Sequence, residues 1–498
     1  MEQKSQDFSS KKIVLIITTT VFSFSSSTTA FFSMGLSSLF WLALAALFYF
    51  IPFALINSEF TSAYPKSKGS LYQWISENLS QRIAFITTFI WYSSYFIWMM
   101  SLFTKLWIPF GIMLFGKDIS KLDFIYGIPT KWILTLLCIV GVIILTTIIK
   151  RGFVKIARWL VIGGICMSIL VFITITSNLI ISFIHPDQII PNIKSSIDSP
   201  TFFETDKLTG FAAQLPFFIF AITAFGGLDT ISSLIDKVGN KKNKFSKAIL
   251  IGGVLVFIVY FLDILTWSMG SNFVEVHSQV DQHLGNLMYG LMDVLSKELA
   301  SSLHFSSGAT YFINQLFIRF TALTLFVSYI GLLATIGYAP LKVLIQGGDS
   351  SLFPKFLLKE NKNGILVNAV HTQALIIAVF VVLLSLGSAL VSSLYNQLTL
   401  MTNLSRSLPY LLIALSYPFF KAKFKGEYMQ LIKHKWQIYF LTSSVFLCVF
   451  LAVSFEVYST FINDGFTSAL FLIIGPLLAG TAANIIYKRN QKRKLQVQ

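Results

Sequence analysis

The sequence predicts an all-α polytopic membrane protein with 12 transmembrane helices, and three observations support this prediction. Hydrophobic residues make up 55% of the 498 residues and charged residues only 12%, against about 25% in soluble proteins. The mean hydropathy is +0.71. The apolar residues also form long runs, whereas a membrane β-barrel would show short alternating strands. So few charges cannot cover the surface of a soluble protein of this length.

Twelve runs reach the roughly 20 apolar residues that a helix needs to cross a bilayer. The first run is too long for a signal peptide, and its Ser and Thr residues crowd its middle rather than a cleavage end, so we expect it to be retained. Two segments between the runs are expected to lie near the membrane surface. The segment 286–299 is weakly amphipathic and suits the outer surface of the membrane. The segment 61–82 suits the membrane interface or a re-entrant position. The predicted spans are 13–34, 38–59, 83–114, 132–150, 159–184, 208–235, 246–271, 311–346, 367–390, 394–419, 436–455 and 468–487.

The basic residues predict the orientation of the chain. The sequence has 38 Lys and Arg against 22 Asp and Glu, a formal net charge of +16. In a soluble protein this excess would suggest a nucleic-acid partner, but here 29 of the basic residues fall in alternate loops and tails and 7 in the loops between them. Cytoplasmic segments are enriched in Lys and Arg. We therefore expect no nucleic-acid partner and both termini in the cytoplasm, with residues 1–12 and 488–498 as tails.

The cysteines and histidines argue against several function classes. Cys138, Cys166 and Cys448 lie inside apolar runs without metal-binding spacing, so no disulfide framework, metal or cofactor is expected. A membrane-embedded transferase would need clustered His, Asp or Glu near one interface, and the spans contain almost no histidine. We therefore do not expect an enzyme.

The first span contains a polar stretch that predicts a broken helix. Six of the eight residues from Phe22 to Thr29 carry hydroxyl groups, which compete for backbone hydrogen bonds at mid-depth in the membrane. Within the bilayer a break is tolerated only around a cavity. The alternative is a polar face for helix packing, since Ser and Thr are common at such contacts.

The sixth span contains a second candidate break at Gly226 and Gly227. Each glycine lowers helix stability by about 1 kcal/mol, and Asp229 follows at a depth where a charge is costly. The alternative is close helix packing with Asp229 in a structural pair. Interrupted segments at matching places in two halves point to a transporter binding site. Two inverted five-helix repeats would make the first and sixth spans symmetry mates.

The two breaks together suggest the chemistry of a ligand. Free N–H groups near Ser26, Ser27 and Thr28 would form a positive helix end that suits a carboxylate. Free carbonyls near Phe220, Thr223 and Gly226 would suit an ammonium group. A zwitterion such as an amino acid, or a related amine, fits both ends. The predicted substrate-binding residues are Phe22, Ser25, Ser26, Ser27, Thr28, Phe220, Thr223, Phe225, Gly226 and Gly227.

A few other charges lie inside the spans. Arg406 has no carboxylate near it in sequence; it could pair with Asp229 or Asp263, or meet a substrate carboxylate. A carboxylate in a low-dielectric medium tends to hold a proton, so Asp229 could carry a coupling proton. We therefore predict a gating or proton-coupling role for Asp229 and Arg406. Asp263 lies toward the outer third of its span, where it could reach water.

Several segments resemble one family of transporters. The chain resembles the amino acid–polyamine–organocation (APC) superfamily, within it the glutamate/GABA antiporter branch, and most closely the YjeM-type permeases of bacterial inner membranes. The resemblance covers nearly the whole chain. It rests on the segments 51–55 with Glu59, 68–74, 225–229 through 236–237, 338–342, and 396–401 with 408–410.

The resemblance implies a leucine-transporter-like fold and alternating access. Two inverted five-helix repeats would occupy 13–184 and 208–419, with two added helices at 436–487. It implies exchange or proton-coupled uptake of amino acids across the cytoplasmic membrane, with protons and membrane lipid as the other partners. It also implies that the first-span serines hold the substrate carboxylate, that sixth-span carbonyls face its amino group, and that Asp229 matches a gating acid.

The chain departs from the family pattern in three places. The usual glycine-containing turn of the first span is Ser25-Ser26-Ser27 here, the sixth-span acid is the shorter Asp229, and Leu332 replaces an acid found in glutamate exchangers. Glutamate/GABA exchange is therefore not carried over. The leading function is a secondary active transporter of a small amino acid or amine. The competing class is a sensor that binds an amino acid on the same fold without moving it.

Overall fold

The computed structural model describes residues 9–198, 204–238, 243–280, 286–386 and 389–497. Within these ranges, ten helices are long and apolar enough to cross a membrane. The helices are α1 (Ser10–Val21), α2 (Phe24–Met34), α3 (Ser38–Ala45), α4 (Ile51–Ala63), α5 (Ser70–Asn78), α6 (Gln81–Lys105), α7 (Trp107–Phe115), α8 (Thr130–Lys150), α9 (Phe153–Ile184), α10 (Ile189–Asp198), α11 (Gly210–Gln214), α12 (Phe217–Ala224), α13 (Leu228–Ser232), α14 (Ile235–Val238), α15 (Lys244–Gly270), α16 (Phe273–Gln279), α17 (Leu287–Ser302), α18 (Ser307–Gln346), α19 (Val367–Ser385), α20 (Ala389–Lys423), α21 (Lys435–Asp464) and α22 (Phe466–Val497).

Short elements connect these helices. The strands β1 (Phe124–Ile125) and β2 (Ile128–Pro129) form an antiparallel hairpin between α7 and α8. Single turns of helix join other elements, among them η1 (Gly35–Ser37) and the π-helical turn η2 (Ala46–Phe50). The amphipathic segment predicted at 286–299 forms the helix α17, but most of its residues are buried, so it packs into the protein more deeply than a surface helix.

The ten spanning helices do not map one to one onto the twelve predicted spans. Half of 13–34 and all of 38–59 fall in one helical run, Phe24–Ala63, in which α2, η1, α3, η2 and α4 follow one another without a gap. The chain turns at η1, where Gly35 has φ +52 and an added Cβ would lie 2.3 Å from the Ser196 carbonyl oxygen. The span predicted at 394–419 lies in α20, which is not among the ten.

Two predicted spans are interrupted. The span predicted at 83–114 comprises α6 and α7, which Leu106 joins with helical backbone angles, whereas the span predicted at 208–235 is divided into α11, α12, α13 and α14. The first span is divided between α1 and α2. Broken helices leave backbone groups that must find partners elsewhere, so these interruptions mark the places to look for a site.

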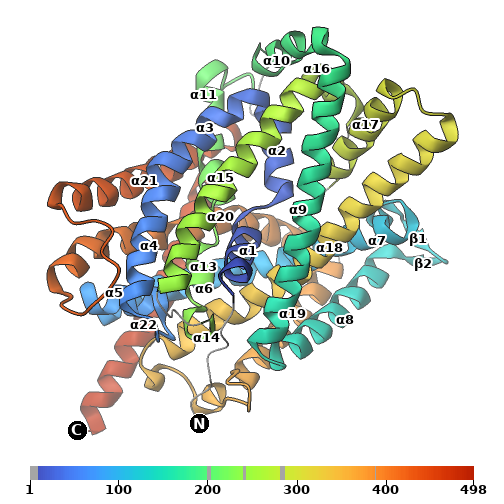
Figure 1. Ribbon diagram of the computed structural model, residues 1–498. Coiled ribbons are helices and arrows are strands. Elements are labelled where there is room, and N and C mark those ends of the chain that lie inside the picture. Colours follow the sequence, from blue (N-terminus) through green and yellow to red (C-terminus); the bar gives the residue numbers. More distant parts are fainter. Residues whose placement is uncertain (1–8, 199–203, 239–242, 281–285, 387–388, 498) are drawn as a thin grey trace.

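Long helices pack around the broken ones. α18 packs on α9 and α6, α20 packs on α6 and α21, and α15 packs on α1, α4 and α9. In Figure 1, α2, α9 and α15 run through the upper half of the molecule, and α18 crosses behind α1. The described residues share one hydrophobic core, with α1, α12 and α13 buried inside it.

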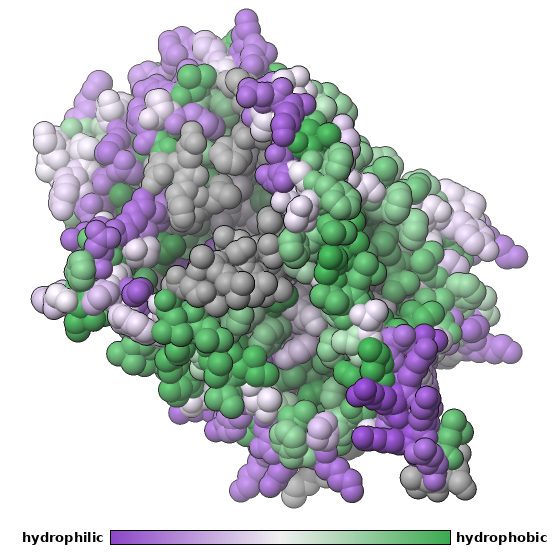
Figure 2. All heavy atoms as spheres, turned by 180° about the vertical axis from the view of Figure 1, so that it is seen from behind, coloured by the Kyte–Doolittle hydropathy of each residue, from purple (hydrophilic) through white to green (hydrophobic). Residues whose placement is uncertain are grey.

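The surface is that of a membrane-embedded protein. Figure 2 shows hydrophobic side chains over the middle of one face and hydrophilic side chains mainly toward the two ends. Large apolar side chains on the outer faces of α8, α9 and α19 are exposed, including Leu136, Phe172 and Leu375. In a folded soluble protein such a surface would be covered, so lipid is the medium that suits it.

The segment between α4 and α6 is packed into the protein. Leu71, Tyr72 and Trp74 are buried on α5, which packs on α6 and α20. Trp74 stacks on Phe60 with ring centroids 4.9 Å apart. These side chains belong to the protein core, because α5 turns its apolar face toward the neighbouring helices; a re-entrant or interfacial position for 61–82 stays a prediction.

Candidate functional site

The first break lies at Phe22 and Ser23, at the start of the predicted polar stretch. Both residues have extended backbone angles, and Ser23 is the N-cap of α2. The rest of the Ser/Thr run, from Ser25 to Thr29, is helical. The break is therefore earlier and shorter than predicted, since hydroxyl side chains can remain in a helix when they bond to its own backbone. Thr28 does so, donating to the Phe24 carbonyl at 2.9 Å.

The free amides at this break differ from those predicted. The N–H groups of Ser26 and Ser27 both donate to the Ser23 carbonyl, at 3.0 and 3.1 Å. Among the residues that the structure describes, the N–H groups of Phe24 and Ser25 have no acceptor. Phe24 is buried and Ser25 is half-buried. The positive end of α2 is thus centred on Phe24 and Ser25, not on Ser26 to Thr28.

The second break lies at Phe225, Gly226 and Gly227, where it was predicted. α12 ends at Ala224 and α13 begins at Leu228. Gly227 has φ +116, a conformation that L side chains rarely adopt, and an added Cβ would lie 2.9 Å from the Thr20 carbonyl oxygen. Glycine is therefore required here by its backbone and by the close approach of α1.

The carbonyls at the second break also differ in part from those predicted. The Phe220 carbonyl accepts the Thr223 hydroxyl at 3.0 Å, and the Thr223 carbonyl accepts the Gly226 N–H at 2.9 Å. Within the described residues, the carbonyls of Phe225 and Gly226 accept no hydrogen bond. These two oxygens form the negative end of α12.

Tyr260 of α15 joins the two breaks. Its hydroxyl accepts the Ser23 N–H at 3.2 Å and donates to the Ala224 carbonyl at 3.1 Å. Its ring also contacts Phe22 and Phe225, with centroids 4.8 and 5.5 Å away. Sequence reasoning missed Tyr260, because a single tyrosine in an apolar span gives no local signal. The breaks are thus held next to each other by one side chain.

Replacing Tyr260 tests this bridge. In Tyr260→Phe, the Ser23 N–H and the Ala224 carbonyl lose their shared partner, and each unpaired buried group costs about 1–3 kcal/mol. We expect substrate affinity to fall at least roughly tenfold, measured by titration of the purified protein. Tyr338→Phe is the matched control, because the buried Tyr338 hydroxyl makes no hydrogen bond to any residue that the structure describes. Equal affinities of the two variants would contradict the bridging role.

Asp229 lies beside the second break, in the first turn of α13. One of its oxygens, Oδ2, accepts the Trp91 indole N–H at 2.6 Å and the Tyr95 hydroxyl at 3.1 Å. The other, Oδ1, is buried without a partner among the described residues. Tyr95 in turn accepts the Thr230 hydroxyl at 2.8 Å. Two aromatic side chains of α6, Trp91 and Tyr95, therefore act as hydrogen-bond donors to Asp229.

Arg406 of α20 lies near Asp229 without pairing to it. Its guanidinium lies over the Trp98 ring, 4.8 Å from the centroid, and its buried Nε has no hydrogen-bond partner in the described part of the chain. No ion pair joins Arg406 to a described acid. Asp229 and Arg406 both act electrostatically on the buried hydroxyls of Tyr49 and Tyr410.

Unpaired polar atoms gather around this place. Besides Asp229 Oδ1 and Arg406 Nε, the Tyr49 and Tyr410 hydroxyls are buried without a described partner. The Tyr410 hydroxyl lies 3.6 Å from where a Cβ on Gly226 would be, so this group borders the second break. Buried polar groups are normally paired, so these four atoms are the groups here that a polar ligand or water would satisfy.

Asp263 differs from its prediction. It was expected near water, but it is fully buried on α15. Oδ2 accepts the Ser27 hydroxyl at 2.5 Å, and Oδ1 accepts the Thr174 hydroxyl at 2.9 Å. A predicted substrate-site residue, Ser27, is therefore turned toward an acid of another helix. The segment 396–401 of α20 carries part of the resemblance to the transporter family. The side chains of residues 396–400 are not among those that the structure describes.

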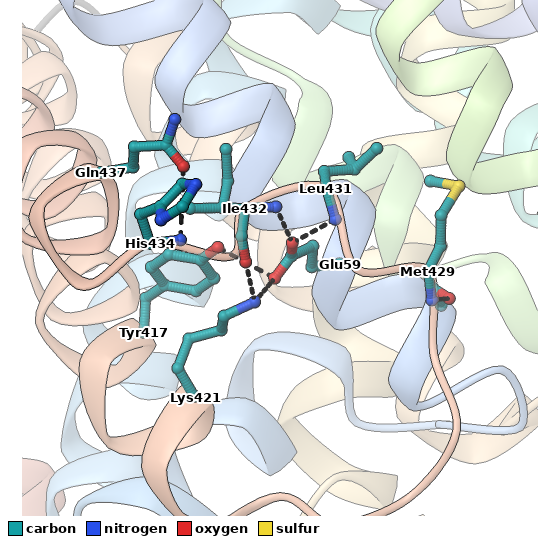
Figure 3. A network of polar contacts seen from close by, with 9 residues as sticks. Glu59, Tyr417, Lys421, Met429, Leu431, Ile432, His434 and Gln437 are labelled. Atoms are coloured by element: carbon teal, nitrogen blue, oxygen red, sulfur yellow. Dashed lines mark hydrogen bonds and ion pairs between the residues drawn. The ribbon is translucent and has the colours of Figure 1, made fainter.

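A second polar network closes one end of the molecule. The buried Glu59 of α4 accepts the Tyr417 hydroxyl and the Lys421 ammonium, each at 2.9 Å. Its other oxygen accepts the N–H groups of Leu431 and Ile432 at 2.7 and 2.8 Å (Figure 3). This network fixes the segment between α20 and α21 onto α4. At the same end, Lys342 of α18 forms an ion pair with Asp236 of α14.

A pocket of about 260 Å³ lies at the opposite end from the Glu59 network. It is formed by the ends of α9 and α15, the start of α16 and the end of α17, and its lining includes His185, Asn192, Glu275 and Glu298. Burial raises the pKa of Glu298 to about 7, although the hydrogen bond from Ser271 acts to lower it.

Across the described ranges, no group of three His, Cys, Asp or Glu side chains could hold a metal.

Comparisons with known proteins show which family the chain belongs to. Residues 8–478 match the model of the amino acid permease family. The chain is 36% identical over 486 residues to the inner membrane transporter YjeM of Salmonella typhimurium, covering 97% of this chain and 96% of that one. It is 24% identical over 381 residues to the aspartate/glutamate permease AcaP of Lactococcus lactis, covering 74% and 71%.

A solved structure shows the same fold. The crystal structure of the Eremococcus coleocola manganese transporter matches with a TM-score of 0.50 and 16% identity, covering 97% of this chain and 94% of that one. The likeness at this identity concerns the fold alone. The family match spans both helix breaks and most of the described helices. The chain is therefore a secondary transporter and belongs to the amino acid permease family.

Proposed function

We propose that this protein moves a small amino acid or related amine across the bacterial cytoplasmic membrane by alternating access, as an exchanger or a proton-coupled symporter. The observation that carries the proposal is the pair of broken helices held together by Tyr260. One break presents unpaired amides and the other unpaired carbonyls. Relatives named as an aspartate/glutamate permease and a glutamate/gamma-aminobutyrate antiporter support this substrate class.

The substrate is proposed to bind between the breaks. Its carboxylate accepts the N–H groups of Phe24 and Ser25, and its ammonium donates to the carbonyls of Phe225 and Gly226. Gly227 keeps the second break open. The other predicted site residues, Phe22, Ser26, Ser27, Thr28, Phe220 and Thr223, support these groups through contacts with Tyr260, Asp263 and the backbone.

The transporter architecture is proposed to have twelve spans. In this arrangement 13–184 and 208–419 are inverted five-helix repeats, followed by two helices at 436–487. The break in the first element of each repeat supports the symmetry. Both termini are placed in the cytoplasm, and relatives named as inner membrane transporters support the location. Lipid surrounds the apolar belt.

Asp229 and Arg406 are proposed to gate the site, with Asp229 as an acid that can exchange a coupling proton. Each has a buried atom without a partner among the described residues, so each can gain a partner when substrate binds or when the helices move. Both residues act electrostatically on the buried hydroxyls of Tyr49 and Tyr410, so movement of either one changes the field at the same two groups.

Counterflow in proteoliposomes tests the proposed function. Vesicles are loaded with unlabelled amino acids and amines, including glutamate and GABA, and entry of each labelled compound is followed. Accumulation of one compound identifies an exchanger and its substrate. If folded protein accumulates none, an imposed pH gradient tests for net uptake. Binding of a compound that is moved under neither condition would instead indicate a sensor and contradict the proposal.

The gating role predicts the behaviour of Asp229→Asn. The neutral amide cannot bind or release the coupling proton, so we expect the turnover rate to lose its pH dependence while some exchange remains. The rate is measured by counterflow at matched inner and outer pH, varied from about 5 to about 8. Asp293→Asn, outside the candidate spans, is the control. A pH profile identical to that of the unmodified protein would count against this role.

A further inference from the structure

A second buried acid, Asp263, lies next to the substrate half-helix. It is fully buried on α15, and each carboxylate oxygen accepts one hydroxyl: Ser27 from α2 and Thr174 from α9. Three helices therefore meet at one carboxyl group. Ser27 belongs to the first turn of α2, the turn that presents the unpaired amides of Phe24 and Ser25.

Asp263 and Tyr260 hold α2 together. They are three residues apart and so lie on the same face of α15. Tyr260 contacts Ser23, and Asp263 contacts Ser27 one turn further along α2. The end of α2 that is proposed to bind the substrate carboxylate is thus fixed to α15 by two neighbouring hydrogen bonds. Any change at Asp263 alters one of them directly.

Among the residues that the structure describes, no cation pairs with Asp263. Within the described residues it forms no ion pair, and the only titratable group acting on it is Tyr260 of its own helix. On α9, Lys155 and Arg158 lie at the start of the helix, at least 16 residues and about 24 Å before Thr174. On the other helices packed against α15, the charged groups are Lys11 and Lys12 (exposed, at the start of α1), Glu59 (in its own network on α4), and Lys194 and Asp198 (exposed on α10).

Two neutral donors do not compensate a buried negative charge. Burying an unpaired carboxylate is costly, and such groups take up a proton when no cation is near. Asp229 differs in this respect, because Arg406 is close and it lies at the N-terminal end of α13. The two buried acids near the breaks therefore have opposite electrostatic settings, although each accepts two side-chain hydrogen bonds.

We propose that Asp263 is a second proton-binding group, which acts as a positioning residue and couples proton binding to substrate affinity through Ser27. A proton taken from water adds to Oδ2, and the new O–H donates to the Ser27 oxygen. The Ser27 hydroxyl then changes from donor to acceptor, and its own hydrogen becomes free to reorient. Loss of the proton restores the donor–acceptor pair. The proposal rests on the proposed function, because it assigns the coupling to the substrate half-helix.

The experiment measures substrate affinity against pH in purified protein, together with proton release or uptake on substrate addition, followed with a pH-sensitive dye. The substrate is the compound identified by counterflow. In the unmodified protein we expect affinity to vary with pH and binding to be accompanied by proton movement. In Asp263→Asn we expect an affinity that changes less than about twofold over the same range, with less proton movement, while exchange at equal pH persists.

Two further variants separate proton binding from structure. Thr174→Val keeps the carboxyl group but removes one hydrogen bond to its charged form, so the midpoint of the affinity profile should move to higher pH by about 1 unit. Thr266→Val on the same helix is the control, since its hydroxyl bonds only to carbonyls of its own helix. Thr174→Val also retains the test if Asp263→Asn does not fold.

The outcomes distinguish this proposal from the proposed function. Failure of counterflow, pH-driven uptake and binding in the unmodified protein would overturn both. Transport with unchanged pH dependence of affinity in both Asp263→Asn and Thr174→Val would overturn only the role of Asp263. Accumulation driven by a sodium gradient and lost in Asp263→Asn, without proton movement, would show a sodium ion at this carboxylate and would also overturn the proton proposal.

Discussion

Gly227→Ala is expected to reduce transport strongly while leaving the protein folded. Alanine at φ +116 stores about 1–3 kcal/mol of backbone strain. Its Cβ would also lie 2.9 Å from the Thr20 carbonyl oxygen, so α1 and α13 must separate. If this strain raises the rate-limiting barrier of the transport cycle by the same amount, the rate drops by about 5- to 150-fold. Initial rates of counterflow, normalised to folded protein by size-exclusion chromatography, give the measurement.

A matched glycine separates the two causes. Gly210 also has positive φ, at +57, but no atom lies within 4 Å of an added Cβ. Gly210→Ala therefore adds backbone strain without a collision and lies outside the breaks. We expect its transport rate to stay within about threefold of the unmodified protein. Similar losses in both variants would show that strain at any glycine is enough, and that the approach of α1 at the second break has no special role.

Glu59→Gln is expected to destabilise the protein more than any other single substitution considered for it. Glu59 and Lys421 are an ion pair whose side chains are 0% and 8% exposed, and the carboxylate also accepts two backbone N–H groups (Figure 3). Removing one partner of a buried pair costs about 3–5 kcal/mol, because the other charge stays buried without compensation. The free energy of unfolding in detergent, from chemical denaturation, tests this expectation.

A double variant and a surface variant complete that test. Glu59→Gln combined with Lys421→Met removes both charges, so it should recover much of the lost stability. Glu77→Gln on α5 changes an exposed acid that accepts a hydrogen bond from Gln73 and forms no ion pair among the described residues, and its effect should stay within about 0.5 kcal/mol. If Glu59→Gln were no worse than Glu77→Gln, the network would not hold the segment after α20 to α4.

The position of the Glu59 network suggests why it is rigid. It and the Lys342–Asp236 pair lie at the same end, and both join elements that are far apart in the sequence. Alternating access needs some helices to move and others to keep their places. Strong contacts of this kind define which helices can move as one body, whereas the breaks at Phe22–Ser23 and Phe225–Gly227 supply the local freedom.

The sequence by itself determined the class of the protein and the neighbourhood of its site. Hydropathy depends on side-chain composition alone, so most spans were placed within a few residues. Gly226 and Gly227 located the second break because glycine acts locally on the backbone. The same local reasoning placed the first break near the Ser/Thr run and identified Asp229 and Arg406 as unusual charges. The resemblance to amino acid permeases was confirmed by the family match.

Only the tertiary structure decided which groups at the site are free and which are paired. Ser23 and Tyr260 are 237 residues apart, and Ser27 and Asp263 are 236 apart, so no local pattern reveals their contacts. The first break falls at Phe22–Ser23 because a tyrosine from α15 supplies the partner that the Ser23 amide lacks. Hydrogen bonds in a membrane must be satisfied inside the protein. Where a helix breaks, and which backbone groups remain for a ligand, therefore depends on what the neighbouring helices bring to that place.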